Sequence, residues 1–193
     1  MKKLLMFSLM FFFAFSLYAQ DDMSNDEQDD MAAWTEFMTP GDHHKILEHA
    51  AGEWTYVAKY WEAPGTDAME SEGNSTGKML YEGRYLKTSY TGNFFGMAFE
   101  GMSIEGYDNA KEEFVSIWID NMGTGIATAA GHYDMDKKEL TYEGTTTNPM
   151  TKEDAWFKQV IHANDDGTIL VDMYSKLEDG SEFKMMEFLM TKK

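Results

Sequence analysis

The feature that most constrains this chain is a series of about ten β-type segments that begins at Gly52-Glu53-Trp54 and runs to Lys193. Clusters of Gly, Asn or Asp, such as Asp165-Asp166-Gly167, separate segments rich in aromatic and β-branched residues. No interval between two segments is long enough for a second helix, which excludes parallel βαβ folds. Because an open meander of this length would leave two bare edges, the sequence predicts an all-β fold, a closed antiparallel up-and-down barrel.

A short N-terminal helix is predicted just before the first strand, over residues 43–51, with Asp42 as its N-cap and Gly52 at its end. Its apolar residues fall at helical spacing and form one stripe. A helix this short is expected to plug or cover one end of the barrel. The predicted strands are residues 53–62, 70–81, 84–92, 99–107, 113–120, 126–134, 139–147, 156–164, 168–176 and 183–191.

Residues 1–19 have the pattern of a secretory signal peptide. Lys2 and Lys3 precede an apolar run, Leu4 to Leu17, that is shorter than the roughly 20 residues of a membrane-spanning helix. We expect cleavage after Ala19; an uncleaved anchor is the alternative. The chain has no cysteine, so it has neither disulfides nor the lipid-bearing cysteine of a lipoprotein. The sequence therefore predicts a periplasmic or secreted protein without membrane insertion after signal cleavage.

The chain is strongly acidic, with a formal net charge of −18 at pH 7. Such a charge argues against nucleic acid and anionic membrane surfaces as partners, and we interpret it as a solubility feature. The densest acidic stretch follows the signal peptide and contains few apolar residues. Residues 20–41 are therefore expected to form an acidic, largely disordered leader, and residues 42–193 a single barrel domain.

Several segments of the chain resemble known families. Gly52-Glu53-Trp54 resembles the Gly-x-Trp signature of the calycin superfamily, which includes the lipocalins and fatty-acid-binding proteins. More specific are the blocks Gly77 to Leu86, Tyr90 to Gly101, Gly106 to Asn109, Trp118 to Gly125 and Asn148-Pro149-Met150. Together they resemble the bacterial family called domain of unknown function 1579, over roughly residues 45–193. The resemblance implies a calycin-like barrel and export, and it supplies no catalytic residues.

One departure from the calycin pattern concerns the first-strand tryptophan, Trp54. Calycins usually pack a basic side chain from the last strand across it, but the only arginine here is Arg84, in the third predicted strand. Lys184 or Lys192 could take that place. Gly52 and Trp54 are thus interpreted as structural residues at the closed end of the barrel, and a functional site is expected at the opposite rim.

At that rim, Gly-rich and Met-rich hairpins combine with aromatic strands, and flexible thioethers adapt to apolar ligands. Arg84 could bind a ligand carboxylate, with a purely structural role as the alternative. The residues expected to bind a ligand are Arg84, Tyr90, Met97, Phe99, Met102, Trp118, Asp120 and Met122.

No motif in the sequence indicates a specific chemistry. There is no nucleophile elbow, no His-Glu-x-x-His and no phosphate loop, so no catalytic residue is predicted. His44 and His49 are five positions apart and do not share a helical face, which disfavours a metal site. Haem binding through His162 is disfavoured because Tyr56 and Ala58 stand where haem-binding calycins carry glycines. No cofactor and no metal are predicted.

Three functions remain after these exclusions. The leading hypothesis is a non-enzymatic module that binds a small apolar or amphipathic ligand inside the barrel. The second is a structural barrel that forms a homodimer without ligand. It is suggested by residues 113–120, which are apolar on both faces, with Ile117 on one face and Trp118 on the other; a helix could cover the second face instead. The third function is a carboxylate-dependent hydrolase or isomerase with Glu100 or Asp120 as the base.

Overall fold

The computed structural model describes residues 25–94 and 96–193, so the predicted signal peptide, residues 1–19, lies outside the described residues. By compactness the chain comprises two units, residues 1–35 and 36–193. Helix α1 (Asn25–Met38) has no buried residue, and none of the described helices is long and apolar enough to cross a bilayer. The helix lies where a largely disordered leader was expected over residues 20–41. Its second half is rich in Ala, Met and Glu, which favour helix over coil.

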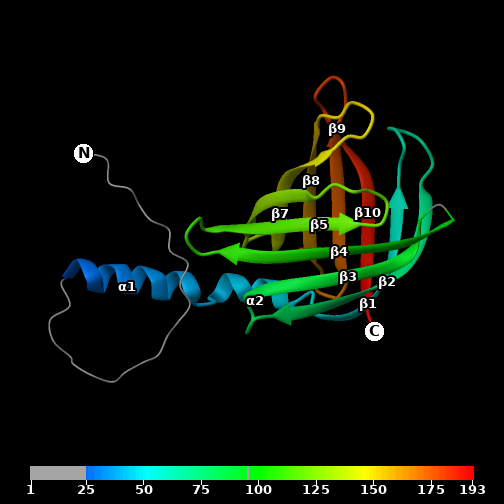
Figure 1. Cartoon of the computed structure of the whole chain (residues 1–193). Coiled ribbons are helices and arrows are strands. Elements are labelled where there is room, and N and C mark those ends of the chain that lie inside the picture. The colour runs from blue at the N-terminus through cyan, green and yellow to red at the C-terminus, as the bar shows by residue number, and fades with distance from the viewer. Residues whose placement is uncertain (1–24, 95) are drawn as a thin grey trace, which may run out of the picture. The chain divides into compact units, whose positions relative to one another are not determined.

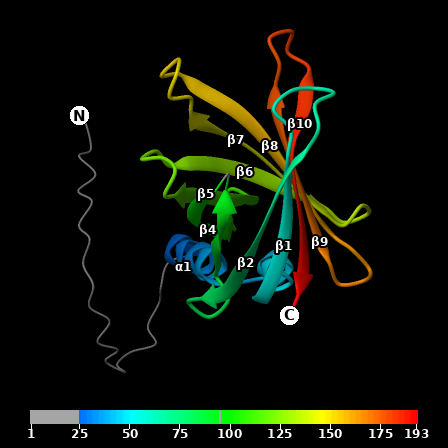
Figure 2. The same ribbon diagram turned by 90° about the vertical axis from the view of Figure 1, so that its right-hand side faces the viewer.

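Ten antiparallel strands form a closed barrel, which confirms the predicted fold (Figure 1). Each strand pairs with the next one in the chain, and β10 closes the barrel by pairing with β1 (Figure 2). All ten predicted strands are present, with their ends shifted by at most three residues. The strands are β1 (Gly52–Tyr60), β2 (Met69–Leu80), β3 (Tyr85–Phe94), β4 (Met97–Asp108), β5 (Glu113–Asp120), β6 (Ala127–Asp134), β7 (Glu139–Thr147), β8 (Asp154–Ala163), β9 (Ile169–Lys176) and β10 (Glu182–Lys192).

Successive side chains of each strand point alternately into and out of the barrel. In β1, Trp54 and Tyr56 are buried inside, whereas Val57 is 37% exposed on the outer wall. In β5, Phe114 is buried inside and Ile117 is 38% exposed outside. The expectation that strands such as β5 carry apolar residues on both faces is therefore confirmed.

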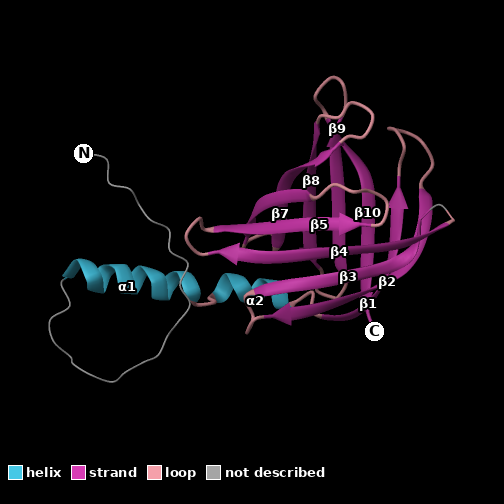
Figure 3. Cartoon of the chain, in the orientation of Figure 1, coloured by secondary structure: helices cyan, strands magenta, loops and turns pink. Residues whose placement is uncertain are grey.

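Helix α2 (Asp42–Glu48) lies against one end of the barrel and packs on β3 and β4 (Figure 3). It is shorter than the predicted helix over residues 43–51, and its N-cap is Gly41, so the prediction of Asp42 is wrong by one position. The Gly41 N–H donates to Nδ1 of His44 at 3.0 Å, so the side chain at the third helical position satisfies the backbone donor of the N-cap residue itself. Leu47 from this helix enters a buried cluster with Leu86, Phe114, Leu140 and Tyr142.

Trp54 seals the same end of the barrel and is only 2% exposed. Its indole Nε1–H donates to the carbonyl oxygen of Ala50 at 3.1 Å, just after helix α2. The ammonium group of Lys192 lies 5.3 Å from the centroid of the Trp54 ring, which confirms that a lysine of the last strand replaces the missing arginine. Lys184, the other candidate, lies 5.6 Å from the Trp61 ring instead.

Candidate functional site

A cavity of about 480 Å³ occupies the barrel interior on the side away from helix α2. Its lining reaches the rim formed by the β1–β2, β3–β4, β5–β6, β7–β8 and β9–β10 hairpins, where Met69 and Met122 are each 41% exposed. Its deep end is formed by Tyr56, Val171 and Met190, which belong to the buried core. The lining includes nine aromatic and six methionine side chains, so the cavity wall is predominantly apolar.

Four aromatic rings from four different strands form a continuous wall of this cavity. The ring centroids of Tyr90 and Trp118 are 5.3 Å apart, and Phe99 stacks on Trp118 at 6.2 Å. Tyr56 extends the group inward, with its centroid 6.2 Å from that of Tyr90. A ligand in the cavity would therefore meet the faces and edges of aromatic rings over much of its surface.

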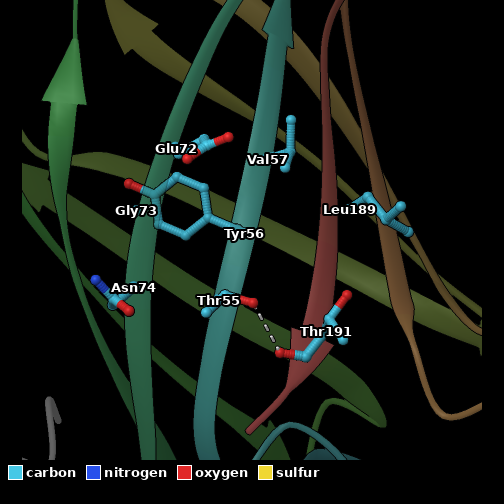
Figure 4. Close-up of a pocket in the computed structure, with 8 residues that line it drawn as sticks. All are labelled: Thr55, Tyr56, Val57, Glu72, Gly73, Asn74, Leu189 and Thr191. Carbon is cyan, nitrogen blue, oxygen red and sulfur yellow. Dashed lines mark hydrogen bonds between the residues drawn. The ribbon is translucent and has the colours of Figure 1, made fainter.

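Glycines in the neighbouring strands make room for these rings. A Cβ atom on Gly73 would lie 2.3 Å from the Tyr56 ring, and one on Gly92 would lie 2.5 Å from the Tyr56 hydroxyl oxygen. Figure 4 shows the Tyr56 ring beside β2 at Gly73. Likewise, a Cβ atom on Gly101 would lie 2.6 Å from the Trp118 ring. These glycines mark sites where a strand carries no side chain so that a ring can lie against its backbone.

Glu105 of β4 is the carboxylate enclosed in this interior. Ser103 Oγ donates a hydrogen bond to one carboxylate oxygen at 3.0 Å, and Tyr142 Oη donates to the other at 3.3 Å. Removal from water raises the pKa of Glu105, and the two hydrogen bonds oppose this shift only in part. Burial, together with the Glu105 carboxylate, raises the pKa of Tyr90 and Tyr142, which therefore remain neutral hydroxyl donors.

The charged residues in the cavity lining are all acidic. They are Glu70 at the rim, Glu105 in the interior and Asp120 at the end of β5, and no Lys, Arg or His of the described residues joins them. Asp120 already accepts the Trp118 indole N–H at 2.6 Å and the backbone N–H of Met122 at 2.8 Å. It therefore orients the indole and the β5–β6 turn, and Glu105 is the acidic group that faces the interior.

The structure brings together five of the residues predicted to bind a ligand. Met97 instead lies at the start of β4, 53% exposed, and does not line the cavity. Met102 alternates with Ser103, which is buried inside, so Met102 points to the outer wall. The predicted residues that do line the cavity are Tyr90, Phe99, Trp118, Asp120 and Met122.

Arg84 lies at the opposite end, in the turn between β2 and β3 rather than in a strand. Its guanidinium donates to the carbonyl oxygens of Tyr81 at 3.0 Å and Met38 at 2.6 Å. The side-chain amide of Asn109 donates to the carbonyl oxygens of Glu36 and Thr39, both at 2.8 Å. Together these side chains satisfy carbonyl groups where helix α1 ends, which gives Arg84 a structural role.

Glu105 and Tyr56 are two of the cavity residues that were not predicted from the sequence. The available signal was the two-residue alternation of β4: once Phe99 is assigned to the interior, Ser103 and Glu105 must also point inward. The same alternation excludes Met102 from that face. It also places Glu100, a candidate base, on the outer wall, where it is exposed.

A second hollow, of about 520 Å³, lies over the outer wall formed by β1, β2 and β10. In Figure 4, Thr55 and Thr191 lie at one end of it, joined by a hydrogen bond of 3.4 Å from Thr55 Oγ1 to the Thr191 carbonyl oxygen. Glu72 is its only charged lining residue, and the hollow is a shallow depression on the outer wall without the aromatic and methionine lining of the barrel cavity. No metal-binding group of three His, Cys, Asp or Glu side chains occurs in the described parts of the chain. The barrel cavity is therefore the candidate site.

Comparisons with known proteins agree with this architecture. A family model described as a protein of unknown function, DUF1579, matches residues 39–192. The crystal structure of Rv2717c from M. tuberculosis has a similar fold, with a TM-score of 0.59 over 80% of this chain and 99% of that one. Sequence identity in that comparison is 7%, so the likeness concerns the fold alone. No curated protein matches the sequence.

Proposed function

We propose that this chain, which belongs to the DUF1579 family of proteins of unknown function, is a non-enzymatic barrel that binds a small apolar or amphipathic molecule in its interior. The observation that carries the proposal is the cavity of about 480 Å³ with its aromatic and methionine wall. This volume lies within the roughly 300–1,000 Å³ typical of small-molecule sites. Burial of apolar ligand surface would drive binding, and flexible methionines would adapt to its shape.

Binding of a neutral fluorescent probe, N-phenyl-1-naphthylamine, tests this function. We expect enhanced fluorescence with the wild-type protein and loss of binding in Ala127→Trp, which places a large ring in the cavity. Ala130→Trp is the matched control, because Ala130 lies on the same strand but is exposed on the outer wall. Equal binding by both variants would show that the probe binds outside the barrel cavity, which would contradict the proposal. Native mass spectrometry of protein purified from its own host would identify a ligand that co-purifies.

The carboxylate-dependent hydrolase or isomerase has less support. Glu100 points away from the cavity, and both oxygens of Asp120 accept hydrogen bonds from Trp118 and Met122. Glu105 lies beside the hydroxyls of Ser103 and Tyr142, without a histidine or lysine in the cavity lining to relay a proton. The arrangement favours holding a ligand over transforming it.

Self-association is the second candidate function, and the outer wall of β4 and β5 favours it. Met102 lies opposite Ile119, and Ile104 opposite Ile117, so four apolar residues form one patch. Because Trp118 points into the cavity, Ile117→Glu is the variant that tests this interface. Light scattering should show a dimer in the wild-type protein and a monomer in Ile117→Glu. A wild-type monomer would contradict self-association and leave ligand binding unaffected.

Export to the periplasm or medium, predicted from residues 1–19, is part of the same proposal. N-terminal sequencing of the protein recovered from those fractions should begin at Gln20. Recovery in the cytoplasm with Met1 intact would contradict it.

A further inference from the structure

We propose that the barrel cavity selects a lipophilic organic cation, such as an amine or quaternary ammonium with an apolar body, and that Glu105 is its counter-ion. This inference rests on the proposed binding function and narrows its ligand class. It is carried by three properties of the cavity: the sign of its charges, the position of Glu105 and the chemistry of its wall.

The first property is the sign of the charges. Among the described residues, the ionisable acids and bases that line the cavity are Glu70, Glu105 and Asp120, with no basic group. Arg84, the residue best suited to a ligand carboxylate, lies at the opposite end and binds backbone carbonyls. A ligand with an anionic head would therefore meet like charges and no counter-ion, whereas a cationic head would meet opposite charges.

The second property is the position of Glu105. An enclosed carboxylate ordinarily has a basic partner, because a charge removed from water is costly unless it is paired. Glu105 receives two hydroxyl hydrogen bonds, from Ser103 and Tyr142, which orient its oxygens but provide no counter-charge for its ionised form. A cationic ligand would supply the missing partner from within the cavity.

The third property is the chemistry of the wall. The faces of Tyr56, Tyr90 and Trp118 carry negative electrostatic potential and attract cations, with tryptophan the strongest of the aromatic side chains. Such clusters of rings favour quaternary ammonium and other organic cations over anions of the same size. At the rim, Met69 and Met122 supply apolar, partly exposed side chains. The cationic head would thus point inward to Glu105, and the apolar body would extend towards the rim.

Displacement of N-phenyl-1-naphthylamine by three ligands with the same ten-carbon chain tests this inference. The ligands are decyltrimethylammonium, decanoate and 1-decanol, each below the concentration at which it forms micelles and at one ionic strength. For the wild-type protein, we expect half-displacement of the probe by the cation at a concentration about tenfold lower than by decanol. Decanoate should need the highest concentration of the three.

Two variants of strand β4 localise the preference. Glu105→Gln should remove it, so that the cation and decanol displace the probe equally. Glu100→Gln removes the same unit of charge from the outer wall of the same strand and should leave the preference unchanged. This control separates the Glu105 site from the general attraction of cations to a chain with a net charge of −18.

The outcomes separate this inference from the proposed function. If decanol or decanoate binds the wild-type protein at least as well as the cation, cation selection is overturned while ligand binding stands. If none of the ligands nor the probe binds, both proposals are overturned. The wild-type comparison needs no variant, and Glu105→Asp, which retains the charge, should keep a cation preference if Glu105→Gln does not fold. Loss of the preference in Glu100→Gln would overturn the role of Glu105.

Discussion

Tyr142 on β7 donates a hydrogen bond of 3.3 Å to Glu105 on β4 across the interior of the barrel. Two strands, β5 and β6, separate β4 from β7 in the wall, so this bond spans the lumen rather than joining neighbouring strands. Tyr142 is 1% exposed and belongs to the core cluster under helix α2. The bond therefore connects the packed end of the barrel to the acidic group at the deep end of the cavity.

Glu105→Gln should make the stability of the protein less sensitive to rising pH. Burial raises the pKa of Glu105 above its ordinary value of 4.5, so the folded protein holds this proton to a higher pH than the unfolded chain does. The contribution of Glu105 to the free energy of unfolding therefore decreases as the pH rises from 4.5 through the folded-state pKa. Tyr90 and Tyr142 stay neutral in this range, so the difference between the wild-type and Glu105→Gln profiles isolates the contribution of Glu105.

Chemical denaturation at several pH values checks this prediction. Glu105→Gln should be more stable than the wild-type protein at neutral pH, and the difference should shrink below pH 4.5. Glu100→Gln, on the exposed face of β4, serves as the control and should follow the wild-type profile. If the free energy of unfolding of Glu105→Gln varied with pH as it does in the wild-type protein, burial would not have raised the pKa of Glu105.

Ser75→Ala should stabilise the protein. Ser75 is 2% exposed, and its Oγ has no hydrogen-bond partner among the described residues. Removing a buried hydroxyl without a partner should raise the free energy of unfolding by about 1 kcal/mol. Ser103→Ala is the matched comparison and should lower it by about 1 kcal/mol, because Ser103 Oγ donates to Glu105. Destabilisation by Ser75→Ala in urea denaturation would indicate a partner, such as a bound water.

Gly73→Ala should destabilise the barrel by about 1–3 kcal/mol through overpacking. The added Cβ would lie 2.3 Å from the Tyr56 ring and 2.4 Å from the Thr91 carbonyl oxygen, and the backbone contact cannot be relieved by rotating a side chain. Gly125→Ala is the control, since its Cβ would meet only Thr147 Oγ1, at 3.8 Å. Thermal unfolding should separate the two variants, and a neutral Gly73→Ala would show that β2 can shift away from Tyr56.

His44 should make helix α2 sensitive to acid. Burial, as the main cause, lowers the pKa of His44 below its ordinary value of 6.5. The unfolded chain thus takes up this proton at a higher pH than the folded protein. The contribution of His44 to the free energy of unfolding should therefore fall as the pH drops from 6.5 through the folded-state pKa.

His44→Asn tests this acid sensitivity, because the asparagine Oδ1 can still accept the Gly41 N–H that Nδ1 accepts now. Denaturation between neutral and mildly acidic pH should show a flatter profile for this variant than for the wild-type protein. His132→Asn changes an exposed histidine on β6 and should leave the profile unchanged. A similar profile in all three proteins would contradict the prediction.

Most of the fold could be predicted because its determinants are local in the sequence. Hairpin turns separate the strands, and the alternation of side chains marks the two faces of each strand. The stretches between successive strands are too short to hold a second helix. The lysine over Trp54 was one of two predicted candidates on β10, and the structure selects Lys192 because the register of β10 on β1 sets it opposite Trp54. The predicted N-cap of helix α2 was one residue too late, because Gly41 takes that position and its N–H donates to the His44 side chain.

The candidate site was harder to predict because its members come from distant strands. Tyr90 and Trp118 were identified from their aromatic character, but Met102 was assigned to the same site as Phe99 although a strand cannot present both to one face. Glu105 could not be distinguished among the 34 acidic residues by composition. Its partner Tyr142 lies on a strand that does not pair with β4, and only closure of the barrel brings the two together.

The pairing of β1 with β10, which sets Trp54 opposite Lys192, makes the last strand of the barrel a requirement for the first. A nascent chain that lacks the final 11-residue strand has two unpaired edges and no enclosed lumen, however well its earlier hairpins have formed. Contacts this distant in sequence also slow folding. A frameshift or proteolytic cut that removes β10 should therefore eliminate the enclosed lumen and leave an aggregation-prone open sheet.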